Sequence, residues 1–238
     1  MKERTLILCS KILVGDMKIV AVVPMKLNNS RLPNKNTKVF TNGEPLCHYI
    51  LSTLLKIEKI DEVYVYCSNS EIKNYIPKGV HYLKRSENLD KDTTKMNEVL
   101  DAFAKDVEAD VYLMTHTTAP FISVEAIKRG LEAVCEGGYD SAFSAKKVQD
   151  FLWSDGHPFN YDLNEIPRTQ DLPVLYMETS GFYIYEARVI CDLHRRIGDK
   201  PYIVEVGEIE SVDIDEEEDF MIADAIYNHC PNIGGFHE

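Results

Sequence analysis

Apolar residues form short continuous runs that alternate with segments of helical spacing over the first two-thirds of the chain. Runs of strand length lie at 18–23, 63–67, 81–83, 110–114 and 141–144. Helical spacing occupies 46–57, 97–104 and 124–135. Strands that are apolar on both faces are typical of a parallel sheet covered by helices on each side. The pattern therefore predicts an α/β fold whose ligands bind at the carboxyl ends of the strands.

The pattern changes after the strand at 141–144. From Lys146 to Pro173 the chain has turn signals, several aromatic residues and no long helical segment. We expect residues 146–180 to form a small subdomain that protrudes from the main sheet. The pattern then predicts elements in the order strand, helix, strand and helix, at 182–185, 186–197, 202–206 and 216–228.

Length and charge limit the class of protein. A chain of 238 residues is large enough for one α/β domain, which we place at 17–238 after an N-terminal extension, 1–16. The net charge of −13 argues against nucleic-acid or anionic-membrane partners. The apolar run at 5–15 is short and interrupted by Lys11, so we expect neither a signal peptide nor a membrane span.

The cysteines indicate the cellular compartment of the protein. The six cysteines include no C-x-x-C pair, which argues against a zinc ribbon. Several cysteines lie within apolar runs, as Cys67 does. We therefore expect buried free thiols and a cytoplasmic protein.

The loop after the first strand is basic and contains no acid. Residues 17–43 carry Lys18, Lys26, Arg31, Lys35 and Lys38 in an otherwise acidic chain. Neither G-x-G-x-x-G nor the Walker pattern is present, so a dinucleotide fold or P-loop kinase is not supported. The loop suits a small polyanion, with triphosphate as the first candidate. A solvated basic loop that balances an acidic surface explains the charges equally well.

A pair of carboxylates lies near the end of the chain. Asp213 and Asp215 alternate around Ile214, which would place both side chains on one face of a strand. Two carboxylates at a strand end suit Mg²⁺, which takes one or two of them together with water and substrate phosphates. A solvated turn is the alternative. The acids at 216–218 fit the start of the last helix.

Two further polar segments are candidates for substrate binding. Arg168 and Gln170 lie together in the protruding segment and could make a forked contact with a carboxylate. His116 and Thr118 follow the strand at 110–114, where a polar ligand would bind. Two alternative interpretations remain. In the first, Arg168 is simply exposed to solvent. In the second, His116 is a loop histidine whose hydrogen bonds are satisfied within the protein.

Taken in order, these segments resemble the acylneuraminate cytidylyltransferase family, the CMP-sialic acid synthetases and relatives that activate other sugar acids such as KDO. Residues 24–36 resemble the phosphate loop P-A-R-x-x-S-x-R/G-L/I-P-x-K-N, and further similar segments follow in the family's order. They are 85–93 (R-P-x-x-L-A-x-D-x), 115–121 (Q-P-T-S-P-L), 140–144 (D-S-x-x-S), 168–173 (R-R-Q-D-L-P), 180–184 (N-G-A-I-Y-I) and 213–215 (D-I-D).

The resemblance implies a Rossmann-like nucleotidyltransferase fold, commonly dimeric, with the protruding segment serving dimerisation and the partner subunit. It implies transfer of CMP from CTP to a sugar acid with Mg²⁺ and release of pyrophosphate. By position, the catalytic residues would be Lys26, Lys35 and Asp215. The nucleotide would contact Met25, Lys26, Asn28, Ser30, Lys35, Asn36 and Arg85. The acceptor would contact His116, Thr118, Arg168 and Gln170, and Asp213 and Asp215 would bind the metal.

Several positions depart from the family's pattern. The Ala-Arg pair of the loop is Met25-Lys26, and lysine offers a point charge where arginine offers a fork. His116 stands for the usual Gln, and Ser180 for Asn, on the expected acceptor side. These changes favour a nonulosonic acid related to N-acetylneuraminate. A nucleotidyltransferase for another acid or nucleotide, and a catalytically silent relative, remain alternatives.

Overall fold

The structure is a computed structural model that describes residues 17–28 and 31–229. The expected extension 1–16 lies outside the described residues. Seven strands form one sheet in the order β3-β2-β1-β4-β8-β5-β9. They are β1 (Ile19–Met25), β2 (Glu62–Cys67), β3 (Val80–Lys84), β4 (Val111–Thr115), β5 (Ser141–Val148), β8 (Leu175–Glu186) and β9 (Pro201–Val206). Strand β8 runs antiparallel to both of its neighbours, and the other paired strands are parallel.

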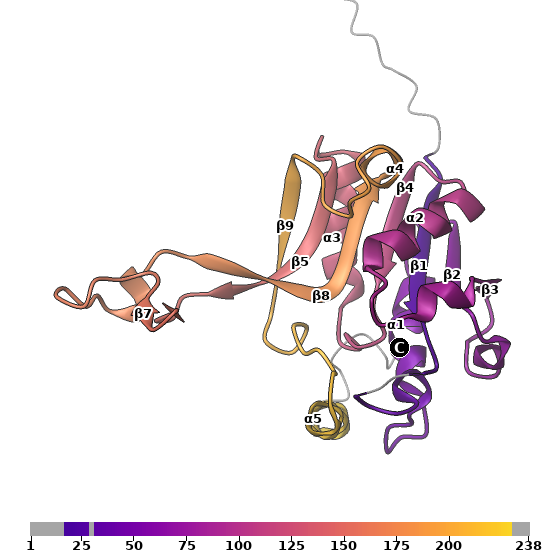
Figure 1. The fold of residues 1–238 in the computed structure, drawn as a ribbon, viewed down its shortest axis with the longest axis horizontal. Helices are drawn as coiled ribbons and strands as arrows, with labels where there is room; N and C mark the ends of the chain where they lie inside the picture. The colour runs from indigo at the N-terminus through magenta and orange to yellow at the C-terminus, as the bar shows by residue number, and fades with distance from the viewer. Residues whose placement is uncertain (1–16, 29–30, 230–238) are drawn as a thin grey trace, which may run out of the picture.

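Helices cover both faces of this sheet (Figure 1). The α-helices are α1 (Leu46–Leu55), α2 (Met96–Asp106), α3 (Val124–Cys135), α4 (Ala187–Cys191) and α5 (Glu217–His229). Short 3₁₀ helices are η1 (Lys35–Thr37), η2 (Ser70–Asn74), η3 (Glu87–Asp90) and η4 (Thr169–Asp171). None of the helices in the described part of the chain combines the length and apolar composition that crossing a bilayer requires.

The central strand shows why the apolar runs of the sequence contain no alternating polar residues. On β1, Ala21 and Val23 pack in one cluster with α1 and α3, whereas Val20 and Val22 pack in another with α2 and α4. All four side chains are completely buried. Successive side chains of a strand point to opposite faces, so a strand covered on both sides is apolar at every position. The expected two-sided α/β sheet is confirmed.

Strands β5 and β8 leave the sheet together and form a long arm (Figure 1). Their register shifts between Phe143 and Ala145, and at the shift Ser144 Oγ lies 3.0 Å from Phe182 N, whose N–H it accepts, and 2.7 Å from Thr179 Oγ1. A Cβ on Gly181 would lie 2.7 Å from Ser144 Oγ, so only glycine fits against this bend. The serine that ends the D-S-x-x-S segment thus fixes the root of the arm.

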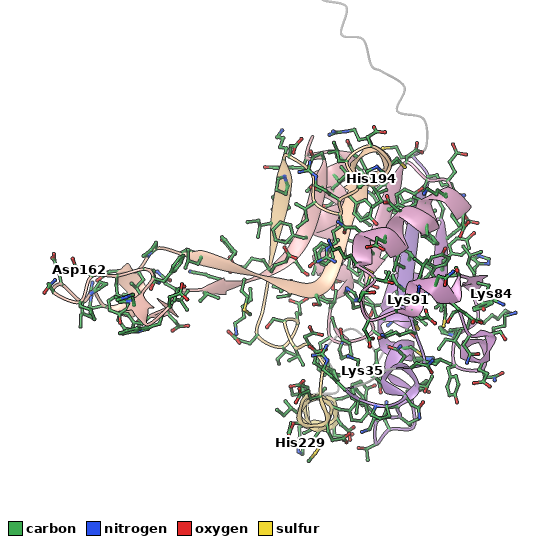
Figure 2. All side chains as sticks on the ribbon, viewed as in Figure 1. Lys35, Lys84, Lys91, Asp162, His194 and His229 are labelled. Carbon is green, nitrogen blue, oxygen red and sulfur yellow. The ribbon has the colours of Figure 1, made fainter. Side chains whose placement is uncertain are left out.

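The far end of the arm carries the small hairpin β6 (Trp153–Ser154) and β7 (His157–Pro158). Asp162 lies at the tip in Figure 2. The expected excursion at 146–180 is therefore present, and it is a ribbon continuous with the sheet. For the same reason β8 begins at Leu175, well before the expected strand at 182–185.

The helix expected at 186–197 is wrong over its second half, because α4 ends at Cys191. His194 adopts a positive φ of 55°, and its N–H donates back to Ile190 O, which closes the helix. Beyond this turn the buried Asp140 carboxylate accepts the N–H groups of Asp199 and Lys200 and draws the chain into β9. The turn is thus fixed by contacts with a residue that lies far away in the sequence.

Helix α5 packs beside the carboxyl ends of the parallel strands. Its Phe220 contacts Phe40 edge-on, with ring centroids 4.8 Å apart, and Tyr227 packs in the same cluster. Ile214, from the loop before α5, is fully buried in this cluster. The cluster therefore holds the loop between β9 and α5 against the edge of the sheet where the family of α/β folds binds ligands.

Candidate functional site

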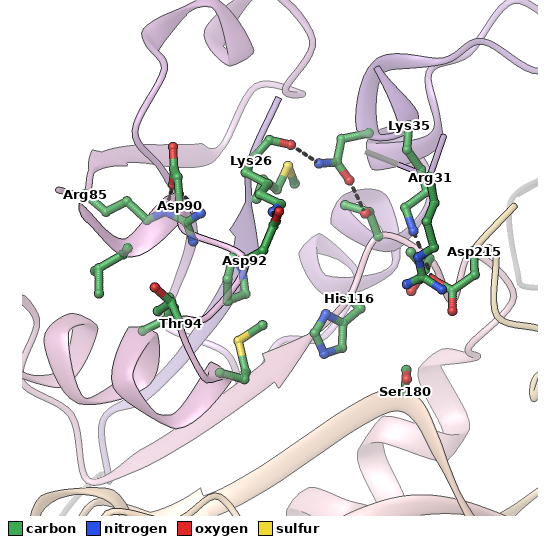
Figure 3. A pocket seen from close by; sticks show the side chains of 18 of the residues that line it. Lys26, Arg31, Lys35, Arg85, Asp90, Asp92, Thr94, His116, Ser180 and Asp215 are labelled. Atoms are coloured by element: carbon green, nitrogen blue, oxygen red, sulfur yellow. Dashed lines mark hydrogen bonds and ion pairs between the residues drawn. The ribbon is translucent and has the colours of Figure 1, made fainter. Parts of the chain in front are cut away.

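A cavity of about 420 Å³ lies at the carboxyl ends of β1 and β4. Its walls come from the loops that follow these strands, from the segment after β3 and from the loop before α5 (Figure 3). The predicted residues that line it are Met25, Lys26, Lys35, Asn36, Arg85, His116, Thr118, Asp213 and Asp215. Segments that are far apart in the sequence thus meet at the edge that the strand pattern indicated.

Lys35 and Asp215 join the two ends of the chain. The buried Lys35 side chain donates from Nζ to Ile214 O at 2.8 Å and contacts Asp215 Oδ1 at 3.2 Å. Arg31 also reaches Asp215 Oδ1, at 2.8 Å. Partial burial opposes ionisation of Asp215, but the hydrogen bonds and charges of Lys35 and Arg31 hold its pKa below the ordinary value. Asp215 is therefore a carboxylate at neutral pH. Arg31 was recognised as part of the basic loop, but its pairing with Asp215 was not predicted.

Asp213 has a different environment. Its Oδ1 atom is buried and accepts no hydrogen bond within the described residues, although the side chain lines the cavity. A buried acceptor without a partner is costly unless a ligand or ion satisfies it. The segment is an irregular extended loop, because β9 ends at Val206, so the predicted strand is wrong here. Both carboxylates still face the cavity, since the residue between them, Ile214, is buried and donates from its backbone N–H to Thr118 O.

Two cations on the opposite side of the cavity, Lys26 and Arg85, are also paired. Lys26 Nζ lies 2.8 Å from Asp92 Oδ1. Arg85 donates from two nitrogens to Asp90 Oδ1, at 3.1 and 2.7 Å. The sequence pattern drew attention to residues 85–93, yet only Arg85 was assigned from it. The two aspartates of that segment are the partners that were missed.

Asn36 holds the basic loop in place. Its Nδ2 donates to Lys26 O at 2.7 Å, and its Oδ1 accepts from Thr117 Oγ1 at 2.5 Å. Both ends of the amide are therefore engaged within the protein, so this side chain positions the loop after β1 against the end of β4. The predicted nucleotide contact of Asn36 stays a prediction.

Three other predicted nucleotide contacts differ in position. Met25 lines the cavity at the end of β1, but its side chain is buried in the core. Asn28 is exposed and lines a neighbouring hollow with Ser68 and Lys84. Ser30 lies outside the described residues. Of the predicted nucleotide contacts, it is therefore mainly the cations that present their side chains to the cavity in the described part of the chain.

His116 is a neutral histidine at the centre of the site (Figure 3). Burial, together with the positive charges of Arg196 and Lys35, lowers its pKa to about 4. The imidazole is therefore uncharged at pH 7. Thr118 and Ser180 line the same cavity. This wall is polar but uncharged, in contrast to the ion pairs beside it.

Arg168 and Gln170 are not brought to this cavity within one chain. Both are exposed on the arm, where Arg168 binds Asp171 through two nitrogens and Gln170 O accepts from Gln149 Nε2. Neither residue lines the cavity of its own chain. Their contact with an acceptor stays a prediction.

Comparison with known proteins shows the family of this chain. A family model described as cytidylyltransferase matches residues 20–215. The chain belongs to the cytidylyltransferase family. The match begins within β1 and ends at Asp215, so it contains both halves of the cavity.

Two curated relatives of this cytidylyltransferase have sugar-acid names. N-acylneuraminate cytidylyltransferase A of Danio rerio is 26% identical over 216 residues, which cover 87% of this chain and 50% of the relative. CMP-N,N'-diacetyllegionaminic acid synthase of Legionella pneumophila is 31% identical over 124 residues, which cover 49% of this chain and 53% of the relative. The chain thus spans about half the length of the curated relatives that it matches.

Solved structures confirm the nucleotidyltransferase fold. CMP:2-keto-3-deoxy-manno-octonic acid synthetase complexed with CTP has a TM-score of 0.68 at 16% identity, covering 89% of this chain and 99% of the other. A 4-diphosphocytidyl-2C-methyl-D-erythritol synthase from Anaerococcus prevotii has a TM-score of 0.66 at 16% identity, covering 90% and 97%. The family resemblance inferred from the sequence is confirmed.

Proposed function

We propose that this cytidylyltransferase transfers CMP from CTP to a sugar acid of the nonulosonic type and releases pyrophosphate. The observation that carries the proposal is the meeting of the basic loop with Asp213 and Asp215 in one cavity. Lys35 and Asp215 are separated by 180 residues and lie 3.2 Å apart. The names of the two curated relatives support a sialic acid-like acceptor, and the CTP complex of the structural relative supports CTP as the donor.

The cations of the cavity suit the triphosphate. In the reaction a hydroxyl oxygen of the acid forms a bond to the α-phosphorus as the bond to the bridging oxygen of pyrophosphate breaks. Negative charge accumulates on the phosphate oxygens, and fixed cations stabilise it. Lys35 and Lys26 are positioned for this role, and Arg31 lies beside Lys35 on Asp215. Each would exchange a carboxylate partner for a phosphate oxygen when CTP binds.

The two aspartates fit a divalent cation. Asp213 offers a buried oxygen without a hydrogen-bond donor among the described residues, and Asp215 lies two positions away on the same cavity. Mg²⁺ needs only one or two protein carboxylates, because water and phosphate complete its octahedral shell. We therefore assign Asp213 and Asp215 as its ligands. When bound, Mg²⁺ would neutralise phosphate charge and orient the triphosphate.

The arm suits a second copy of this chain. Eight of the fifteen exposed large hydrophobic side chains of the described residues lie between positions 151 and 177. They are Phe151, Trp153, Phe159, Leu163, Ile166, Val174, Tyr176 and Met177. Such a density of exposed apolar groups marks an interaction surface. We propose a homodimer in which the arm packs on the partner and brings Arg168 and Gln170 toward the partner's cavity.

A pyrophosphate-release assay tests the proposed function. The purified protein is incubated with Mg²⁺, each of the four nucleoside triphosphates, and N-acetylneuraminic, legionaminic, pseudaminic or KDO acid in turn. We expect release only with CTP and with one or a few of the acids. Release with another nucleotide would replace CTP, and no release with any pair would contradict the proposed activity.

A further inference from the structure

A second cavity adjoins the proposed active site at Met96. It has a volume of about 400 Å³ and shares Met96 with the first cavity. Its charged lining consists of Lys95, Arg195 and Arg196 together with one acid, Glu178. A surplus of cations is unusual in a chain whose net charge is −13. The second cavity therefore suits an anion.

Arg196 lines the second cavity and is held there by contacts with residues of β8. Its Cζ lies 4.1 Å from the centroid of the buried Tyr183 ring, in a cation–π contact. Its Nη2 lies 3.3 Å from Tyr183 Oη and 3.5 Å from Glu178 Oε1, the latter at the weak limit of a hydrogen bond. Within the described residues the guanidinium makes no hydrogen bond beyond these two, and its side chain is 27% exposed. Arginine so oriented retains donors for a bidentate contact.

The surrounding wall is fixed by the fold. Asn97, at the start of α2, donates from Nδ2 to His194 O in the turn after α4, at 3.1 Å. Arg195, next in sequence, is engaged by Asp199 at 2.7 Å. The turn that ends α4 early is therefore what places Arg196 beside the active site. A helix continuing to Ile197 would have carried this side chain elsewhere.

The chemistry of a 2-keto sugar acid restricts where its carboxylate can lie. In the cyclic form the attacking hydroxyl and the carboxylate are attached to the same carbon, so the carboxylate must lie next to the reacting centre. On the nucleotide side of His116 the cations Lys35 and Arg31 are paired with Asp215 and are needed for phosphate. Arg196 offers a cation in the adjoining cavity, which shares Met96 with the first one, and its positive charge helps to lower the pKa of His116.

We propose that Arg196 anchors the carboxylate of the acceptor acid, with Lys95 at the rim of the same cavity as a supporting charge. This inference rests on the proposed function, because it presumes an acid that attacks CTP. It assigns to the body of the chain a role that the family resemblance gave to Arg168 on the arm. Arg196 is then a specificity-determining residue that lies outside every segment on which the resemblance rests.

The test compares an acid with its amide. Using CTP at saturation and the acid that the release assay identifies, we measure KM and kcat for the wild type, Arg196→Ala, Arg196→Lys and Arg129→Ala. Arg129 is a surface arginine of α3 and serves as the matched control. Loss of a charge-assisted contact to a carboxylate should raise the KM for the acid about 10- to 100-fold in Arg196→Ala. Arg196→Lys should recover part of this, and KM for CTP should not change.

The primary amide of the same acid isolates the contact with the carboxylate. The wild type should prefer the acid over the amide, and Arg196→Ala should lose most of this preference. An equal rise in KM for acid and amide, or a loss of acid preference in Arg168→Ala but not in Arg196→Ala, would overturn the proposal. Binding of CTP to Arg196→Ala, measured by calorimetry, shows that the variant is folded.

The two proposals fail in different ways. Turnover by the wild type with an unchanged preference in Arg196→Ala would reject the anchor and keep the proposed function. If the wild type does not turn over any acid, the anchor is tested by titrating N-acetylneuraminic acid and KDO into wild type and Arg196→Ala, each saturated with CMP. Binding that depends on Arg196 would support the anchor alone, and equal or absent binding would reject it.

Discussion

The strand-end cavity and the arm differ in how their side chains are paired. Those of the cavity are charged and already hold partners, whereas those of the arm are apolar and exposed. In the cavity, four ion pairs join Lys26, Arg31, Lys35 and Arg85 to acids of the same chain. On the arm, large apolar side chains such as Trp153 and Phe159 are more than half exposed. Charged groups that already hold partners can exchange them for a charged ligand at little net cost, whereas exposed apolar groups gain only when another surface covers them. The cavity is thus organised for a small anion and the arm for a protein surface.

The largest expected effect comes from the cavity's carboxylates. Asp215→Ala removes the group that holds both Lys35 and Arg31 and one of the two proposed Mg²⁺ ligands. We expect Mg²⁺-dependent pyrophosphate release to be abolished. Glu216→Gln, which alters the next residue outside the cavity, should retain near wild-type activity. Retained Mg²⁺-dependent activity in Asp215→Ala would remove Asp215 from the metal site.

The next effect tests a single cation. Lys35→Ala should leave the fold intact and lower kcat by about 10²- to 10³-fold, because fixed charges that stabilise a transition state typically contribute that much. Lys38→Ala is the matched control, since Lys38 pairs with Glu217 and does not line the cavity. Near-normal turnover in Lys35→Ala, measured by pyrophosphate release, would remove Lys35 from the catalytic residues.

On the arm, a substitution at an exposed apolar residue should act first on the association of two chains. Trp153→Ala should weaken dimerisation about 30-fold if Trp153 is a central interface residue, as measured by sedimentation velocity over a concentration series. Tyr75→Ala, an exposed aromatic residue away from the arm, is the control. A wild-type protein that stays monomeric at high concentration would contradict the role given to the arm.

The smallest expected effect is on the KM for CTP, and it comes from the ion pair between Lys26 and Asp92. The hydrogen bond and charge of Lys26 lower the pKa of the exposed Asp92, which is therefore ionised across the neutral range. Phosphate must displace this carboxylate from Lys26. We expect Asp92→Asn to lower the KM for CTP a few-fold, with kcat nearly unchanged. A raised KM would instead show that Asp92 assists nucleotide binding.

Much of the fold was predictable because the relevant signals are local. The β1 and α3 segments, for example, are contiguous apolar patterns, and the structure places them at 19–25 and 124–135. The direction of β8 was not predictable, since an apolar run is the same for parallel and antiparallel strands. The early end of α4 was also missed, because helical spacing continues to Ile197 and the contacts that turn the chain come from Asp140.

The candidate site shows the same division between local signals, which were predictable, and contacts across the chain, which were not. Lys35, Asp213 and Asp215 were recognised because their own segments carry the motif. Their geometry depends on contacts across the chain, such as the one between Lys35 Nζ and Ile214 O, which no local pattern contains. Arg196 was missed for the same reason: its neighbours in sequence resemble an ordinary helix, and its role arises from stacking on Tyr183.

The contact between Lys35 and Ile214 has a consequence for biosynthesis. All seven strands of the sheet are complete once the chain has been synthesised to Val206. Asp213, Asp215 and the carbonyl group that holds Lys35 are translated afterwards. A ribosome-bound or truncated chain that ends at Val206 therefore has every strand yet lacks one wall of the cavity. The complete cavity should thus form only once the segment that follows β9 has been added, which makes the cavity a late feature of the growing chain.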